Sequence, residues 1–134
     1  MMTKNQAIGL LTSLAAIAEG YTTTTTIPWK QRNPGDMTLS RVGKPTPNGK
    51  VTYDLHSQGW QDLEAQFERI FSGKDPLYPS VMTWEELEAR YTGSPLPTFW
   101  GTFFANHLKV YLSDPIRDWW RANVNEANMA DPLP

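Results

Sequence analysis

Apolar residues recur at helical spacing near the start of the chain: Ile8, Leu11, Leu14, Ala15 and Ala18. Residues three and four apart share one face of a helix, so this pattern predicts an amphipathic helix from about Thr3 to Glu19. The helix is expected to stop at Gly20, because glycine suits the left-handed position that follows a helix.

The same segment can also be compared with a secretory signal, since Lys4 precedes an apolar stretch that ends in Ala16-Ile17-Ala18. Gly9, Thr12 and Ser13 interrupt that stretch, and its helical pattern favours a folded helix over a cleaved leader. We therefore expect the mature protein to keep residues 1–18, whose apolar face would complete the core.

The hydrophobic period changes along the rest of the chain. Residues 21–35 form an irregular loop that holds five consecutive threonines, and Met37–Val42 and Lys50–Asp54 are typical of short strands. Turn residues between them (Pro45, Pro47, Asn48 and Gly49) predict a hairpin. Further helices are expected over about 57–72, 83–91 and 98–112, and from Pro115 with Asp114 as N-cap. The pattern predicts an α+β fold that is mainly helical, with one small β-hairpin.

Length and composition exclude several classes of protein. The 134 residues suit a single domain, expected over 1–123, followed by a polar tail over 124–134. A net charge of −2 disfavours nucleic-acid binding, and no segment reaches the ~18 apolar residues of a membrane span. With no cysteine and two histidines, neither a metal site nor a cofactor is expected. The sequence does not indicate an oligomeric state.

Aromatic residues are numerous, with six Trp, five Tyr and five Phe, and they favour a groove that stacks a flat ligand. Tyr21 and Trp29 lie in the irregular loop, where no helical pattern directs them inward, so they are candidates for contact with sugar rings. Trp60 and Trp84 follow the helical period and are expected in the core, whereas Trp100 is ambiguous. One of Trp119 and Trp120 is expected to point inward and the other to lie at the surface. His56 is expected to cap a helix start, and His107 to be partly buried.

Glu19 is the strongest candidate for chemistry. It follows apolar helical residues at the negative end of a helix dipole, and both influences raise the pKa of a carboxyl group. A carboxylic acid that stays protonated near neutral pH can protonate the departing oxygen in glycosidic bond cleavage. A solvated glutamate at a helix end is the alternative. Asp36 is the best candidate for a second carboxylate, though it and Asp54 also suit turn caps. Glu64, Glu68, Glu85, Glu86 and Glu88 are expected on solvated helix faces.

Four motifs occur in order over about residues 7–112: Ala18-Glu19-Gly20, Asn33-Pro34-Gly35-Asp36, Gly59-Trp60 and Thr83-Trp84. Together they resemble a lysozyme-like family, the small phage and bacterial domains related to lytic transglycosylases and goose-type lysozymes. The chain departs from the family's pattern at Arg32, where relatives usually have another Asn.

The resemblance implies a lysozyme-like fold in which Glu19 is the catalytic acid and the turn that contains Asn33 and Gly35 forms part of the cleft wall. It implies a lysozyme or lytic transglycosylase that cleaves the β-1,4 glycan of peptidoglycan. Among the other aromatic residues, Trp100 is a further candidate for substrate binding. The second class is a non-catalytic module that binds glycan or serves a virion or secretion machine. Such a protein would be made in the cytoplasm and act at the cell wall or periplasm if exported or released.

Overall fold

The computed structural model describes residues 1–73, 75–79, 81–94 and 98–125. The chain divides into two compact units, and the boundaries between them fall inside two long helices. The central unit is residues 11–67, and the terminal unit is residues 1–10 with the described residues from 68 onward. The described part is mainly helical, and its strands form a two-stranded antiparallel sheet, so the predicted α+β class is confirmed.

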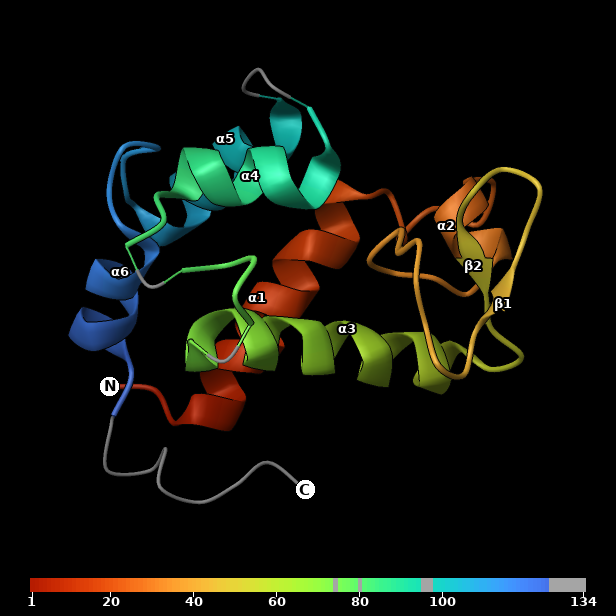
Figure 1. Cartoon of the computed structure of the whole chain (residues 1–134), viewed down its shortest axis with the longest axis horizontal. Helices are drawn as coiled ribbons and strands as arrows, with labels where there is room; N and C mark the ends of the chain where they lie inside the picture. The colour runs from red at the N-terminus through yellow and green to blue at the C-terminus, as the bar shows by residue number, and fades with distance from the viewer. Residues whose placement is uncertain (74, 80, 95–97, 126–134) are drawn as a thin grey trace. The chain divides into compact units, whose positions relative to one another are not determined.

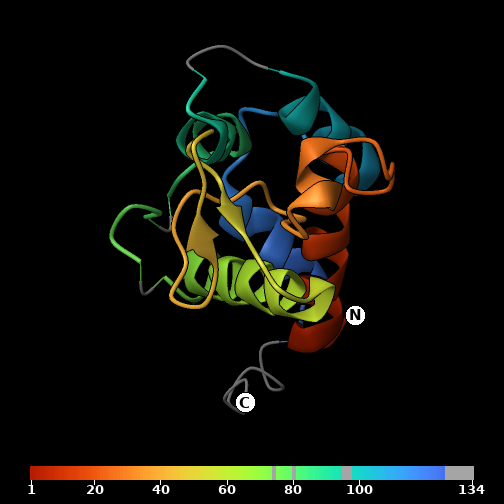
Figure 2. The same ribbon diagram turned by 90° about the vertical axis from the view of Figure 1, so that its right-hand side faces the viewer.

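The central unit contains the C-terminal part of α1 (Lys4–Ala18), the short helix α2 (Ile27–Lys30), the strands β1 (Lys44–Pro45) and β2 (Val51–Thr52), and most of α3 (His56–Ser72). The first helix and the helix that begins near residue 57 were both predicted, and their limits agree within two residues. After β2 the chain continues almost directly into α3 (Figures 1 and 2). In the middle of the predicted loop, Thr26 caps α2, a helix that the sequence pattern did not indicate.

A hairpin is present, but both strands are short, and the first lies at Lys44–Pro45, where Pro45 was predicted to belong to the turn. Lys44 pairs with Thr52 and Pro45 with Val51, whereas Met37–Val42 does not form a strand. Ser40 explains the difference, because its hydroxyl accepts hydrogen bonds from the backbone N–H groups of Val42 and Gly43, at 3.1 and 2.8 Å. This local bonding turns the chain at the point where a strand would have to continue.

Glycine at position 59 allows the turn after α2 to approach α3 closely. A Cβ atom at this position would lie 2.0 Å from the carbonyl oxygen of Arg32 and 2.9 Å from Cδ of Pro34. The Gly59-Trp60 motif therefore has a physical reason in this chain: a side chain at position 59 would push the turn away from the helix.

The terminal unit contains the start of α1, the end of α3, α4 (Trp84–Thr92), α5 (Phe99–Leu108) and α6 (Ile116–Asn123). The capping box of Thr83 and Glu86 at the start of α4 was predicted and is confirmed. α5 ends earlier than expected, because Lys109 adopts a left-handed conformation. The predicted helix after Asp114 is present as α6, but its predicted cap was wrong: Pro115 is the N-cap, and Asp114 accepts a hydrogen bond from the backbone N–H of Tyr111.

Stacked aromatic side chains fill the core of the terminal unit. Phe71 stacks on Trp120 with ring centroids 4.9 Å apart, and Trp84 meets Trp119 edge to face at 6.1 Å. Trp119 and Trp120 are both buried, so the prediction that one of them lies at the surface was wrong. Val124, the first residue of the predicted tail, is buried and forms a parallel bridge with Met2, and the N–H of Asn125 donates to the carbonyl of Met2 at 2.8 Å. Residues 126–134 of that tail lie outside the described residues.

Among the helices that the structure describes, none is both long and apolar enough to cross a membrane.

Candidate functional site

Glu19 lies where α1 ends in a Schellman motif. Gly20 has a φ of 78°, and its N–H donates to the carbonyl of Ile17 at 3.0 Å, while the N–H of Tyr21 donates to that of Ala16 at 2.9 Å. These two bonds satisfy carbonyl groups at the helix end and reverse the chain direction. They hold the Glu19 backbone in one place, and its side chain is half-buried.

Burial raises the pKa of Glu19 from its ordinary value of 4.5 to about 7. The negative charge of Asp36 adds to the increase, and the positive charge of Lys50 opposes it. The raised pKa was predicted from the sequence and is confirmed, although the contribution of Asp36 was not foreseen. Near neutral pH, Glu19 can therefore both donate and accept a proton.

An ion pair holds Asp36. Nζ of Lys50 lies 3.1 Å from the Asp36 carboxylate and also donates to the Asp36 carbonyl at 3.3 Å. Asp36 has a φ of 50°, in the left-handed region, and its N–H donates to the carbonyl of Asn33 at 3.1 Å. Its side chain is thus fixed by the turn on one side and by Lys50 on the other.

Asn33 builds this turn from the inside. Its side chain is fully buried, and its Nδ2 donates to the carbonyls of Met37 and Val51 at 2.9 and 3.0 Å. Its Oδ1 accepts from the N–H of Met37 at 2.9 Å. Asn33 and the buried Gly35 were predicted to contact substrate, but the structure places both in the interior of the turn that carries Asp36.

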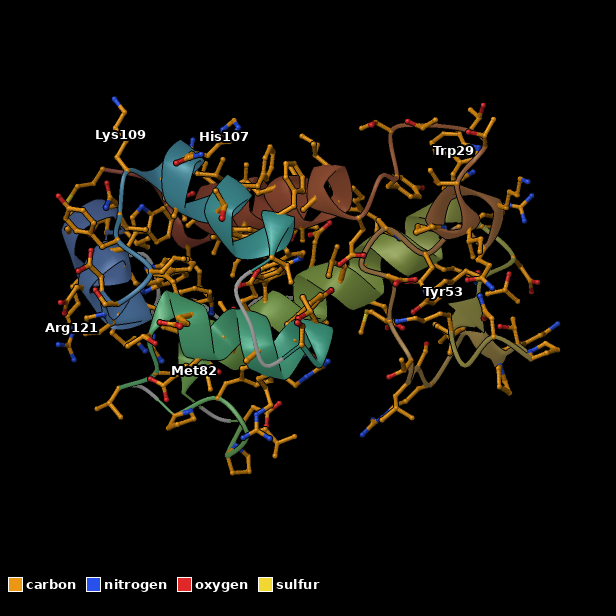
Figure 3. The ribbon with its side chains drawn as sticks, turned by 90° about the horizontal axis from the view of Figure 1, so that it is seen from above. Trp29, Tyr53, Met82, His107, Lys109 and Arg121 are labelled. Carbon is orange, nitrogen blue, oxygen red and sulfur yellow. The ribbon has the colours of Figure 1, made fainter. Side chains whose placement is uncertain are left out.

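Four half-buried rings gather beside the start of α3: Tyr21, Trp29, His56 and Trp60. Trp29, labelled in Figure 3, comes from α2, and its ring lies 4.6 Å from His56 and 5.0 Å from Tyr21. Tyr21 also lies 6.3 Å from Trp60. The predicted pair Tyr21 and Trp29 is therefore brought together, and two rings from α3 join it.

Tyr21 and His56 are hydrogen-bonded through the phenol oxygen and Nδ1. Burial raises the pKa of Tyr21, and burial together with the charge of Arg32 lowers the pKa of His56. Both shifts favour the neutral forms, in which one ring nitrogen of His56 carries the proton and the other accepts a hydrogen bond.

An open pocket of about 330 Å³ lies against this cluster. Its lining residues are Tyr21, His56, Ser57, Trp60, Gln61 and Glu64. Trp60 was predicted to be a core residue, but it is half-buried and lines this pocket. The sequence carried a signal for it: His56, Trp60 and Glu64 are spaced four apart and so share one face of the helix.

The remaining candidates lie elsewhere. Trp100 is buried in the terminal unit, where it stacks on Tyr91 and Phe104 at 5.0 and 4.2 Å, so its position is that of a core residue. His107 is exposed against the ring of Phe103, contrary to the expectation of partial burial. Asp54 is exposed near Lys44, with 3.8 Å between the charged atoms.

Three glutamates that were predicted to be solvated have other surroundings: Glu64 is half-buried and lines the pocket, and Glu88 and Glu68 have partners from other elements. Glu88 is 1% exposed and accepts hydrogen bonds from the N–H and hydroxyl groups of Thr98 and from the N–H of Gly101. Glu68 is half-buried and lies 2.6 Å from Nζ of Lys4. Helical spacing could not indicate either partner, because each comes from another element.

Within the described residues, no group of three or more His, Asp or Glu side chains is arranged to hold a metal ion. The chain matches no family model, no curated protein and no solved structure.

Proposed function

We propose that this protein is a lysozyme-like enzyme that cleaves the β-1,4 glycan of peptidoglycan, with Glu19 as its general acid. The observation that carries the proposal is a half-buried carboxyl group whose pKa is raised to about 7 beside an ion-paired aspartate. Such a group can hold a proton at the pH at which a glycosidic oxygen must receive one. The ordered motifs shared with lysozyme-like domains support the same assignment.

In this mechanism the Glu19 carboxylic acid gives its proton to the glycosidic oxygen, and the bond from that oxygen to the anomeric carbon breaks. Positive charge develops on the sugar ring, and the negative charge of Asp36 stabilises it. The Glu19 carboxylate then takes the proton of a hydroxyl group on the same sugar. That oxygen attacks the anomeric carbon and closes an anhydro ring, so no water and no protein nucleophile are consumed.

A hydrolytic lysozyme would instead need Asp36 as nucleophile or as the base that activates water. The two carboxylates would then stand ~5–5.5 Å apart for retention or ~6.5–9.5 Å apart for inversion. The ion pair of Asp36 with Lys50 favours an electrostatic role for Asp36, and we therefore prefer the single-acid transglycosylase.

The proposal is tested by measuring lysis of purified cell walls as a decrease in the turbidity of their suspension. Glu19→Gln is expected to reduce the rate by about 10³-fold, because the amide cannot donate the proton. Asp36→Asn should retain appreciable activity, and mass spectrometry should detect anhydro-muropeptides. Glu85→Gln, at an exposed glutamate of α4, is the matched control and should leave the rate unchanged.

Full activity in Glu19→Gln would contradict the enzymatic proposal. Hydrated reducing ends, combined with an inactive Asp36→Asn variant, would indicate the two-carboxylate lysozyme instead.

A non-catalytic glycan-binding module is the second candidate, and the aromatic pocket favours it, since ring stacking alone can hold a sugar. The net charge of −2 is also unusual for an enzyme that must approach an anionic wall. Binding to cell walls without any lysis by the wild-type protein would identify this module.

A further inference from the structure

The pocket on the first turns of α3 combines two kinds of surface. Tyr21 and Trp60 contribute aromatic rings, which pack well against the apolar face of a ring-shaped ligand. Ser57, Gln61 and Glu64 contribute a hydroxyl, an amide and a carboxylate on successive turns of one helix face. A ligand that fits both surfaces has a flat apolar face and several hydrogen-bonding groups around its edge.

Charge narrows the choice of ligand. Glu64 is the acidic residue among the six that line the pocket, and none of those six is a lysine or an arginine. A phosphate or carboxylate group beside Glu64 would therefore meet a like charge, and Arg32, whose charge acts on Tyr21 and His56, is not among the lining residues. A carboxylate accepts hydrogen bonds well from neutral hydroxyl and amide donors.

The size of the pocket further limits which ligands can fit. A volume of about 330 Å³ lies at the lower end of small-molecule sites, which span ~300–1,000 Å³. This space suits one six-membered sugar ring, and the open side of the pocket allows a polymer to continue beyond it.

We propose that this pocket binds a single uncharged pyranose ring, with Trp60 as its stacking surface and Glu64 and His56 as partners for its polar substituents. The proposal rests on the proposed function for the identity of the polymer, and it adds a separate subsite built by α3. Trp60 and Glu64 are assigned to binding and not to the chemistry at Glu19.

The state of His56 supports this assignment. Its Nδ1 is engaged by the hydroxyl of Tyr21, so Nε2 is the ring nitrogen that remains for a ligand hydroxyl, a group that can both donate and accept a hydrogen bond. The bond to Tyr21 also joins two lining side chains from different segments, so part of the pocket is organised before a ligand arrives.

The test uses the intact chain carrying Glu19→Gln, so that the ligand is bound without being cleaved. Chitotriose is titrated and followed by NMR amide shifts and by calorimetry. We expect shifts at Tyr21, His56 and Trp60, and about tenfold weaker binding after the further change Trp60→Ala, the loss typical of one stacked ring. Glu64→Gln should weaken binding as well, without removing the stacking surface.

Matched variants lie outside the pocket: Tyr111→Ala removes an exposed aromatic ring, and Glu85→Gln neutralises an exposed glutamate. Neither should change the affinity for chitotriose. Trp60→Phe keeps a stacking ring and should retain most of the affinity, which separates loss of stacking from loss of folding.

Unchanged affinity in both Trp60→Ala and Glu64→Gln, or shifts confined to residues outside the pocket, would overturn the subsite. If the wild-type protein lyses cell walls while the pocket variants bind chitotriose normally, the proposed enzymatic activity is supported and only the subsite is contradicted. Pocket binding without lysis would keep the subsite and remove the enzyme.

Discussion

Glu88 in the terminal unit and Glu19 in the central unit are both withdrawn from water, yet their surroundings are opposite. Glu88 lies at the N-terminal end of α5, where the hydroxyl of Thr98 and the N–H groups of Thr98 and Gly101 donate to it. The positive end of that helix also favours a negative charge. Gly101 is required here, because a Cβ atom would lie 2.6 Å from the carboxyl carbon of Glu88.

Glu19 lies instead at the C-terminal end of a helix, and the nearby charge of Asp36 has the same sign. Its burial is only partly compensated by Lys50, and the result is a pKa of about 7. The difference teaches that burial alone does not make a carboxylate reactive. A buried carboxylate with enough donors strengthens the fold, whereas one with too few holds its proton into the neutral range.

The largest expected effect comes from removing the charge at Glu88. Glu88→Gln should lower the free energy of unfolding by ~2–4 kcal/mol, because the three donors to Oε2 lose a charged acceptor and an NH2 group replaces the second buried oxygen. Urea denaturation at pH 7 measures this. Glu85→Gln on the same helix is the control and should change stability by about 0.5 kcal/mol or less. Equal stability of the two variants would mean that the buried hydrogen bonds of Glu88 contribute nothing to folding.

Glu19→Gln should raise the free energy of unfolding relative to wild type, whereas Glu88→Gln lowers it, and the size of the increase should depend on pH. Well below pH 4.5 the group is protonated in both the folded and the unfolded chain; as pH rises through 4.5 toward 7, the unfolded chain loses its proton first. The wild-type protein therefore loses stability over this range, and the glutamine variant does not. Measured against the difference at pH 4, the variant should gain ~1–3 kcal/mol over wild type by pH 8. Parallel stability curves for the two proteins would show that the Glu19 proton is not linked to folding.

Much of the fold follows from local pattern. The helical spacing near Leu11 and Leu63 and the capping box at Thr83 depend on neighbours in sequence, and these predictions agree with the structure. The predictions that were wrong concern features set by contacts between distant parts of the sequence or by a single side chain. Ser40 redirects a predicted strand, and burial of both tryptophans of α6 depends on aromatic partners from other helices.

In the candidate site, too, the features that depend on local position were predictable, and those that depend on long-range contacts were not. The raised pKa of Glu19 agrees with its expected apolar surroundings at the end of a helix. The loop position of Tyr21 and Trp29 predicted that both border a groove; Tyr21 lines the pocket, whereas Trp29 contacts the lining residues Tyr21 and His56. The burial of Asn33 was not predictable, since its partners on Val51 and Met37 become neighbours only after the hairpin folds. Trp60 was missed because one helix carries a core face and a pocket face side by side.

Two substitutions test whether the charges of Asp36 and Lys50 change the pKa of Glu19. Each charge should shift that pKa less than burial does. Asp36→Asn removes a charge that raises the pKa of Glu19, and Lys50→Met removes one that lowers it. The alkaline limb of the rate of wall lysis should therefore move to lower pH in Asp36→Asn and to higher pH in Lys50→Met. Lys44→Met, at an exposed lysine of the hairpin, should leave the limb in place. A shift in the same direction for both variants would mean that breaking the ion pair matters more than either charge.

The smallest expected effect concerns the backbone at Arg32, which adopts a φ of 55°. Asparagine enters this left-handed region more readily than arginine, so Arg32→Asn should raise the free energy of unfolding by ~0.5–1 kcal/mol. Lys109, with a φ of 57° in the terminal unit, is the matched position, and Lys109→Asn should give a similar gain. The two variants should differ at His56, because the charge of Arg32 lowers the pKa of that ring. NMR titration should therefore show the pKa of His56 rising in Arg32→Asn and staying constant in Lys109→Asn. An unchanged His56 titration in both variants would mean that burial alone keeps the imidazole neutral.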